Sequence, residues 1–259
     1  MIDPADAAEA LINARIGYTI LDDFPGGKYP ANAAEAHAVL DAIITQFQLP
    51  VGGWKAAFTN AAGQKAMGVD GPACGPLFAP YIVPSPANLN LPADSWRGVE
   101  AEFGFRMSGN LPAREAPYTL EEVVAAAGTL HPAIEVVDSR VATGSKHGGV
   151  AVIADHCGNA AFVHGAAVPD WRGLDLAVAK VDVKINGEIV VSGSGAAVMD
   201  NPLNSLTWIA NHLSSRGKSL KSGDWVTTGS TMGIVKAPPG STVVADFGAL
   251  GAVTVVFAI

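Results

Sequence analysis

Short apolar runs recur from residue 99 onward, and their length limits this part of the chain to short strands joined by tight turns. The 29 glycines among 259 residues fit the same pattern, because glycine favours turns and close backbone approaches. Asn186-Gly187, between two of the runs, is typical of a two-residue hairpin. We therefore expect a strand-rich body. The runs are residues 99–107, 133–137, 150–154, 181–185, 188–191, 225–228, 242–247 and 253–258.

Helix signals are concentrated before this body. Asp3-Pro4 and Asn32 each open an amphipathic run at a typical N-cap, so we expect the first ninety residues to be largely helical. Residues 71–92 are dense in Pro and Gly and are expected to form a loop-rich connector. The sequence thus predicts an N-terminal helical cap region at residues 1–80 and a β-rich body at residues 81–259.

Two further helices are expected within the body. Thr119 and Glu122 form a capping box before an apolar pair, and Asn201-Pro202 opens a second amphipathic run. Helices packed on a strand-rich roll make the predicted fold class α+β.

Composition excludes several classes of function. The net charge of −8 opposes binding to nucleic acid, and no stretch approaches the roughly 20 apolar residues of a membrane span. The N-terminus carries acids where a signal peptide has Lys or Arg, so we expect a cytoplasmic protein without a membrane partner. Cys74 and Cys157 lack the paired spacing of a zinc or redox motif and are expected to be reduced thiols.

Three glutamates form the most informative pattern. Glu100 and Glu102 alternate with apolar residues, so both carboxylates point to one face of a strand. For this pair alone, a solvated strand face is the simpler interpretation. Glu135, however, lies within a second apolar strand, where a carboxylate needs a positive partner. In the same strand segment, Asp138 and Arg140 are expected to pair with each other or to brace the strand.

Three carboxylates without His or Cys suit a hard cation, Mg²⁺ or Mn²⁺, which prefers oxygen ligands and keeps positions open for water or substrate. A 2-oxo acid can chelate such an ion through its carboxylate and keto oxygens. The ion then stabilises the enolate formed when a proton moves at the neighbouring carbons. The glutamates therefore predict a metal site at which a small 2-oxo acid can chelate the ion.

A specific combination of segments adds to this reading. They are Gly53-Trp54-Lys55 and residues 67–72, 99–105, 132–140, 200–203, 208–213, 228–231 and 245–251. In this combination the chain resembles the fumarylacetoacetate hydrolase superfamily, especially its 2-oxopent-4-enoate hydratase branch with the related 4-oxalocrotonate decarboxylases. The resemblance runs from about residue 54 to the C-terminus and is weaker in the N-terminal helices.

The resemblance implies a mixed β-roll behind an N-terminal helical region, with Mg²⁺ held by Glu100, Glu102 and Glu135. It also implies that Lys55 holds the substrate carboxylate or assists proton transfer, and that Ser230 contacts the substrate. Taken alone, Lys55 also fits an ordinary surface lysine. Members of the family form homo-oligomers, so we expect the same here.

Two positions depart from the family pattern. Ala73 stands where the hydratase branch has an acid, and His156 follows Asp155 where the branch has Asn. His156 is a candidate to compensate as acid or base, although a structural histidine is an equal alternative. Asp70 is a second candidate if its loop turns inward, and its simpler role is turn formation.

The predicted reaction is the Mg²⁺-dependent addition of water to a 2-hydroxydienoate or its 2-oxo-enoate tautomer through a metal-stabilised enolate. One alternative is decarboxylation of a 2-oxo-3-enedioate, which requires a basic contact for the second carboxylate. Another is C–C hydrolysis of an acylpyruvate or 1,3-diketone. A non-catalytic partner of the same fold is a third, opposed by the intact glutamates and Lys55.

Overall fold

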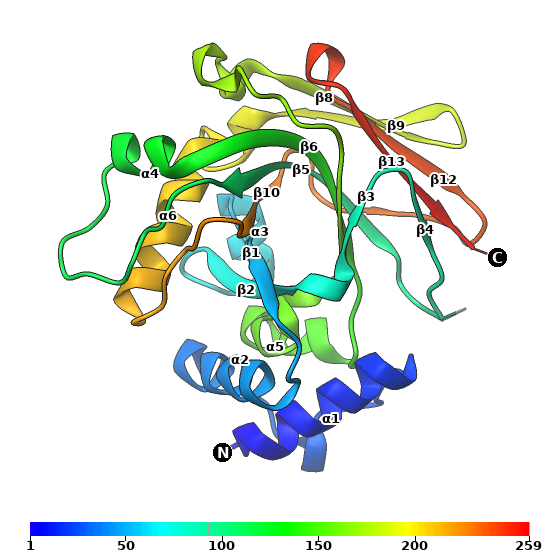
Figure 1. The fold of residues 1–259 in the computed structure, drawn as a ribbon. Helices are drawn as coiled ribbons and strands as arrows, with labels where there is room; N and C mark the ends of the chain where they lie inside the picture. The colour runs from blue at the N-terminus through cyan, green and yellow to red at the C-terminus, as the bar shows by residue number, and fades with distance from the viewer. Residues whose placement is uncertain (93, 259) are drawn as a thin grey trace.

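The computed structural model describes residues 1–92 and 94–258, which form two mixed β-sheets with helices around them (Figure 1). The eight-stranded sheet contains β1 (Val51–Ala57), β2 (Ala73–Phe78), β3 (Ile82–Pro84), β5 (Gly98–Met107), β6 (Ala127–Val137), β7 (Asn159–His164), β10 (Trp225–Ser230) and β11 (Val235–Lys236). The five-stranded sheet contains β4 (Ala87–Leu89), β8 (Lys180–Ile185), β9 (Glu188–Ser194), β12 (Thr242–Asp246) and β13 (Ala252–Phe257). The strand orders are β2-β1-β10-β5-β6-β7-β3, with β11 on β5, and β4-β13-β12-β8-β9. The α+β prediction is confirmed.

The main hydrophobic core contains residues from both sheets. From β5 it receives Val99, Phe103 and Phe105, which are fully buried, and from β12, β13 and their neighbours it receives Val243, Val255 and Phe257. The ring of Phe103 meets that of Phe247 edge to face, with 5.3 Å between centroids. The predicted alternation along β5 is confirmed, and the glutamates of this strand face away from the core.

The helices are α1 (Pro4–Gly17), α2 (Ala33–Gln46), α3 (Ala61–Met67), α4 (Leu120–Ala126), α5 (Gly149–Ala154) and α6 (Pro202–Ser215). Asp3, Asn32 and Asn201 accept backbone hydrogen bonds at the starts of α1, α2 and α6, and the Thr119–Glu122 capping box precedes α4. The four predicted helix starts are therefore confirmed. Figure 1 shows α1 and α2 below the larger sheet, with α5 between them and the strands.

The prediction that the first ninety residues are largely helical is wrong for β1 and β2, which belong to the larger sheet. β1 pairs with β10 on one side and β2 on the other, so tertiary pairing decides its conformation rather than local propensity. Gly53 permits this pairing, because a Cβ atom there would lie 2.1 Å from the carbonyl oxygen of Trp225. The predicted connector at residues 71–92 likewise contains strands.

The predicted strand at residues 150–154 is also wrong, because these residues form α5. A short apolar run has no periodicity that separates a buried strand from a buried helix. The predicted hairpin is confirmed, since β8 and β9 pair across Asn186-Gly187. Among the described residues, the helices are too short or too polar to span a bilayer.

Candidate metal and 2-oxo acid site

Three glutamates converge on one face of the larger sheet. β5 and β6 run antiparallel with Glu100 directly opposite Glu135, and Glu102 lies two residues further along β5 on the same face. One carboxylate oxygen from each residue lies within 4.8 Å of the other two. Glu102 and Glu135 are fully buried, and Glu100 is partly exposed. The predicted convergence of the three acids is confirmed.

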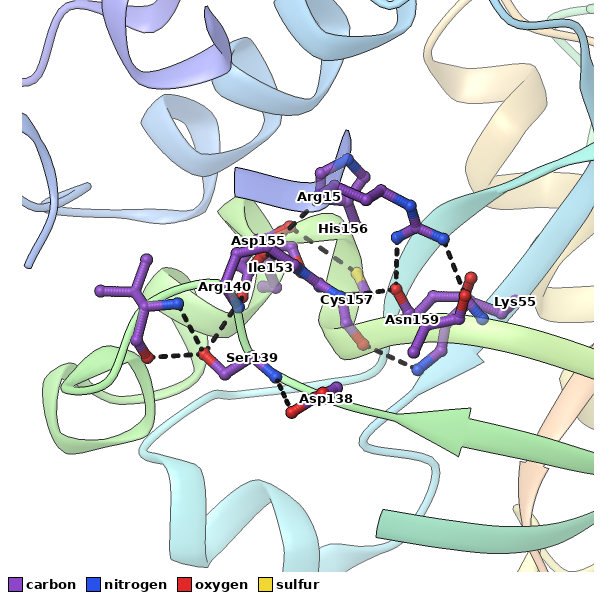
Figure 2. A network of polar contacts seen from close by, with 12 residues as sticks. Arg15, Lys55, Asp138, Ser139, Arg140, Ile153, Asp155, His156, Cys157 and Asn159 are labelled. Atoms are coloured by element: carbon purple, nitrogen blue, oxygen red, sulfur yellow. Dashed lines mark hydrogen bonds and ion pairs between the residues drawn. The ribbon is translucent and has the colours of Figure 1, made fainter. Parts of the chain in front are cut away.

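A buried lysine faces these acids from β1. Lys55 Nζ lies 2.9 Å from Glu135 Oε2. It also donates a 2.8 Å hydrogen bond to the carbonyl oxygen of Cys157 (Figure 2). Burial alone lowers the pKa of Lys55, but the attraction of Glu135 and Glu100 outweighs burial and raises it. Lys55 is therefore a buried cation and not a surface lysine.

The protein holds one oxygen of each buried glutamate and leaves the other free of hydrogen bonds. Glu102 Oε2 accepts from the Thr227 hydroxyl and, at 2.7 Å, from the backbone N–H of Gly229, while Oε1 has no hydrogen-bond partner. Glu135 Oε1 accepts from Asn159 Nδ2 at 2.9 Å, and Oε2 has only its ion pair with Lys55. Unsatisfied buried oxygens of this kind fit a cation-binding site.

Electrostatics show the same shortage of positive charge. Burial, together with repulsion by Glu135 and Glu100, raises the pKa of Glu102 well above its ordinary range. Burial also raises the pKa of Glu100 to about 7, although Lys55 opposes the shift. A second positive charge among these carboxylates would stabilise their ionised forms.

A cavity of about 840 Å³ opens beside this cluster. Lys55, Glu100 and Ser230 all contribute to its lining. A small molecule that enters the cavity can therefore contact the Lys55 ammonium group and the Glu100 carboxylate.

The structure does not bring His156 or Asp70 into this cavity. His156 is fully buried outside the cavity lining, with its ring 6.4 Å from that of Phe47 and 6.0 Å from that of Phe78, between centroids. Burial lowers its pKa to about 3, so it is neutral near neutral pH. Asp70 is exposed after α3 and also lies outside the lining. For His156, the structural role is the one the packing favours.

A polar network that supports Glu135 was missed in the sequence. Arg140 pairs with Asp155, at 2.6 Å from Nε to Oδ1, and its Nη1 donates to the carbonyl oxygen of Asn159 (Figure 2). Arg15 of α1 donates to the same carbonyl at 2.5 Å. Asn159 in turn orients Glu135. No local pattern signals this network, because the partners of Arg15 and Arg140 lie far from them in the sequence.

Of the two alternatives for Asp138 and Arg140, pairing with each other is wrong, because Arg140 pairs with Asp155. Asp138 instead accepts from the hydroxyl of Ser95 and, at 3.0 Å, from the backbone N–H of Trp96. It therefore fixes the loop before β5 at the cavity, while Arg140 binds Asp155.

A strained turn presents the carbonyl group that binds Lys55. His156 and Cys157 have φ values of 54° and 51°, in the left-handed region that residues with a Cβ atom rarely adopt. Two such residues in succession require support from their surroundings, which the packing of His156 against the aromatic rings provides. The turn aims the Cys157 carbonyl oxygen at Lys55 Nζ.

The pKa of Glu100 predicts how stability depends on pH when divalent ions are absent. Between the ordinary value of 4.5 and about 7, folded Glu100 keeps a proton that the unfolded chain releases. Stability from this group therefore falls as pH rises, by up to about 1.4 kcal/mol per pH unit. Glu100→Gln removes this pH dependence. With chelator present, the unfolding free energy of the variant minus that of the parent should therefore increase as pH rises from 4.5 to about 7. Denaturant titrations at several pH values measure the difference, and parallel pH profiles would contradict the assignment.

Comparisons with known proteins agree with this arrangement. No family model matches the chain. A 2-keto-4-pentenoate hydratase of Paraburkholderia xenovorans (strain LB400) is 31% identical over 240 residues, which cover 91% of this chain and 86% of that protein. The solved 4-oxalocrotonate decarboxylase from Pseudomonas putida G7, complexed with magnesium and adipate, is 27% identical with a TM-score of 0.86 and covers 98% of this chain and 97% of that one. The chain also shares the fold of the fumarylpyruvate hydrolase from Pseudomonas aeruginosa in complex with Mn²⁺ and pyruvate. That protein is 17% identical with a TM-score of 0.62, and the match covers 82% of this chain and 91% of that one.

Proposed function

The chain belongs to the family of 2-keto-4-pentenoate hydratases and 4-oxalocrotonate decarboxylases in the fumarylacetoacetate hydrolase superfamily, and on this premise we propose that it is a Mg²⁺-dependent hydratase. Its substrate would be a 2-hydroxydienoate or the tautomeric 2-oxo-enoate. The observation that carries the proposal is the meeting of Glu100, Glu102 and Glu135 with Lys55 beside one cavity.

The donor set suits Mg²⁺, with Mn²⁺ as the alternative. All three ligands are carboxylates. Glu102 Oε1 is buried without a hydrogen bond, and Glu135 Oε2 has only its ion pair with Lys55. When bound, the ion would supply positive charge that stabilises negative charge on the oxygens of a 2-oxo acid. The relative solved with magnesium supports the same choice.

Lys55 and Ser230 are assigned to substrate binding. Protonation of the 2-hydroxydienoate at its terminal carbon gives a 2-oxo-3-enoate, and addition of water across the 3,4 double bond gives a 4-hydroxy-2-oxo acid. Because its pKa is raised, Lys55 would act as a hydrogen-bond donor to the substrate carboxylate, or pass on a proton, rather than act as a base. Ser230 lines the cavity next to Glu100.

Charge in the cavity favours hydration over decarboxylation. A 2-oxo-3-enedioate carries a second carboxylate, which needs a cationic partner when it leaves water. Among the described residues that line the cavity, Lys55 is the single Lys, Arg or His, and it is already assigned to the first carboxylate, so the second would have no cation of its own. Decarboxylation is kept as the second candidate because a decarboxylase shares the fold over nearly the whole chain.

Turnover by the purified protein tests the proposal. With Mg²⁺ added, 2-hydroxypenta-2,4-dienoate should lose its dienol absorbance and yield the 4-hydroxy-2-oxo acid, and chelation should stop the reaction. A 2-oxo-3-enedioate should release little CO₂, and an acylpyruvate should not be cleaved. CO₂ release as the main activity, or no Mg²⁺-dependent turnover of any of the three, would refute the hydratase assignment.

Assembly and location complete the proposal. We expect a homo-oligomer in the cytoplasm. Light scattering of the purified protein and fractionation of expressing cells test these two points.

A further inference from the structure

The cavity beside Lys55 and Glu100 is much larger than a five-carbon acid. Its volume of about 840 Å³ lies in the range of roughly 300–1,000 Å³ in which pockets enclose drug-sized ligands. If the oxo-acid end of a substrate lies at Lys55 and Glu100, the rest of its carbon chain extends into the remaining space. That space is sufficient for a large substituent on the far end.

The walls of this space are mainly apolar. Ala62 and Ala66 lie one turn apart on α3, and their small side chains leave the cavity wide along that helix. The larger apolar side chains of the lining are Ile20, Phe58, Met67, Trp96, Val141 and Ile234. An apolar group gains free energy on moving from water onto such a surface.

Two of these side chains form an exposed apolar pair. Trp96 is 41% exposed and Ile234 is 47% exposed. They lie together over β5, because a Cβ atom on Gly98 would meet Trp96 Cζ3 at 2.2 Å and Ile234 Cγ2 at 3.0 Å. Asp138 fixes the backbone of Trp96 in this place. A ligand that covered both side chains would remove their apolar surface from water.

Charge in the lining opposes a second carboxylate. Asp94 and Asp138 contribute carboxylates to the lining, and the charge of Asp155 is held by Arg140, whereas Lys55 is the one cation of the lining among the residues described. A ligand carrying negative charge away from Lys55 would therefore meet like charge and no second cationic side chain.

We propose that the substrate is a monocarboxylic 2-hydroxydienoate or 2-oxo-enoate with an aryl or long alkyl group on the carbon far from the carboxylate, an inference that rests on the proposed function. The oxo-acid end would lie against Lys55 and Glu100. The apolar tail would lie between α3 and the pair formed by Trp96 and Ile234.

Calorimetry with saturated, unreactive 2-oxo acids tests the proposal separately from catalysis. Mg²⁺-loaded protein is titrated with 2-oxopentanoate, 2-oxo-5-phenylpentanoate and 2-oxohexanedioate. We expect the phenyl compound to bind at least about tenfold more tightly than 2-oxopentanoate, and the diacid to bind more weakly than either. Equal affinity for the phenyl compound and 2-oxopentanoate, or preference for the diacid, would overturn the inference.

A matched pair of variants locates the tail. Ala66→Phe fills the cavity and should remove most of the phenyl preference, whereas Ala61→Phe, on the same helix but outside the lining, should keep it. Retention of the preference in Ala66→Phe would overturn the assigned location. The ratio of affinities in the parent decides the substrate class even if a variant fails to fold. If the protein binds the phenyl compound preferentially but does not hydrate a 2-hydroxydienoate, only the proposed reaction is refuted. If it hydrates the dienoate but shows no preference for the phenyl compound, only this inference is refuted.

Discussion

Replacing Lys55 with methionine should lower the rate of substrate hydration by at least about 10²–10³-fold. This is the loss expected when one preorganised donor is removed from a buried reaction site. Methionine is similar in length, so the cavity keeps its shape while the positive charge disappears. The same change should tighten Mg²⁺ binding, because the ion would no longer be repelled by the ammonium group. Turnover and metal affinity are thus expected to move in opposite directions, as calorimetry and kinetics on one sample can show.

Stability gives a second readout of Lys55→Met. Without divalent ions, loss of the cation leaves buried carboxylates uncompensated and should cost about 3–5 kcal/mol of unfolding free energy. Added Mg²⁺ should return part of this loss. Lys65→Met, at an exposed position on α3, is the matched control and should change neither the turnover nor the unfolding free energy. Turnover of Lys55→Met within tenfold of the parent would remove Lys55 from the substrate-binding site.

The glutamate cluster was predictable in part, because strand geometry orders two of its members. Alternation places Glu100 and Glu102 on one face, and an acid in an apolar strand such as Glu135 needs a partner nearby. The pairing of β5 with β6, and the register that sets Glu100 opposite Glu135, are properties of the folded sheet.

The support of the site depends on contacts between distant segments. Arg15, Arg140 and Asn159 meet although α1 and β7 are separated by most of the chain, and single-sequence patterns contain no signal for such meetings. The same reason explains the missed strand β1, whose glycines become strand residues only because β10 and β2 lie on either side. The two roles open for His156, an acid–base group or a structural histidine, could not be separated in the sequence because its burial depends on tertiary packing.

Replacing Glu102 with glutamine should separate metal binding from folding. The amide oxygen can still accept from Thr227 and Gly229, so the local hydrogen bonds survive while one buried negative charge is lost. Because burial and the neighbouring acids disfavour the Glu102 carboxylate, its removal should stabilise the protein without divalent ions. The melting temperature should rise by about 2–4 °C for each kcal/mol of repulsion relieved.

With Mg²⁺ the order should reverse. At a Mg²⁺ concentration about 100 times the dissociation constant, the ion should stabilise the parent by about 2.7 kcal/mol. Glu102→Gln should gain almost none of this stabilisation and should lose its hydratase activity. Thermal unfolding with and without Mg²⁺ measures both effects, and Glu9→Gln on the exposed face of α1 should behave as the parent. Repulsion among the acids and attraction to the ion have the same electrostatic origin. If Glu102→Gln were more stable than the parent without divalent ions yet bound Mg²⁺ as tightly as the parent, these carboxylates would not form a metal site.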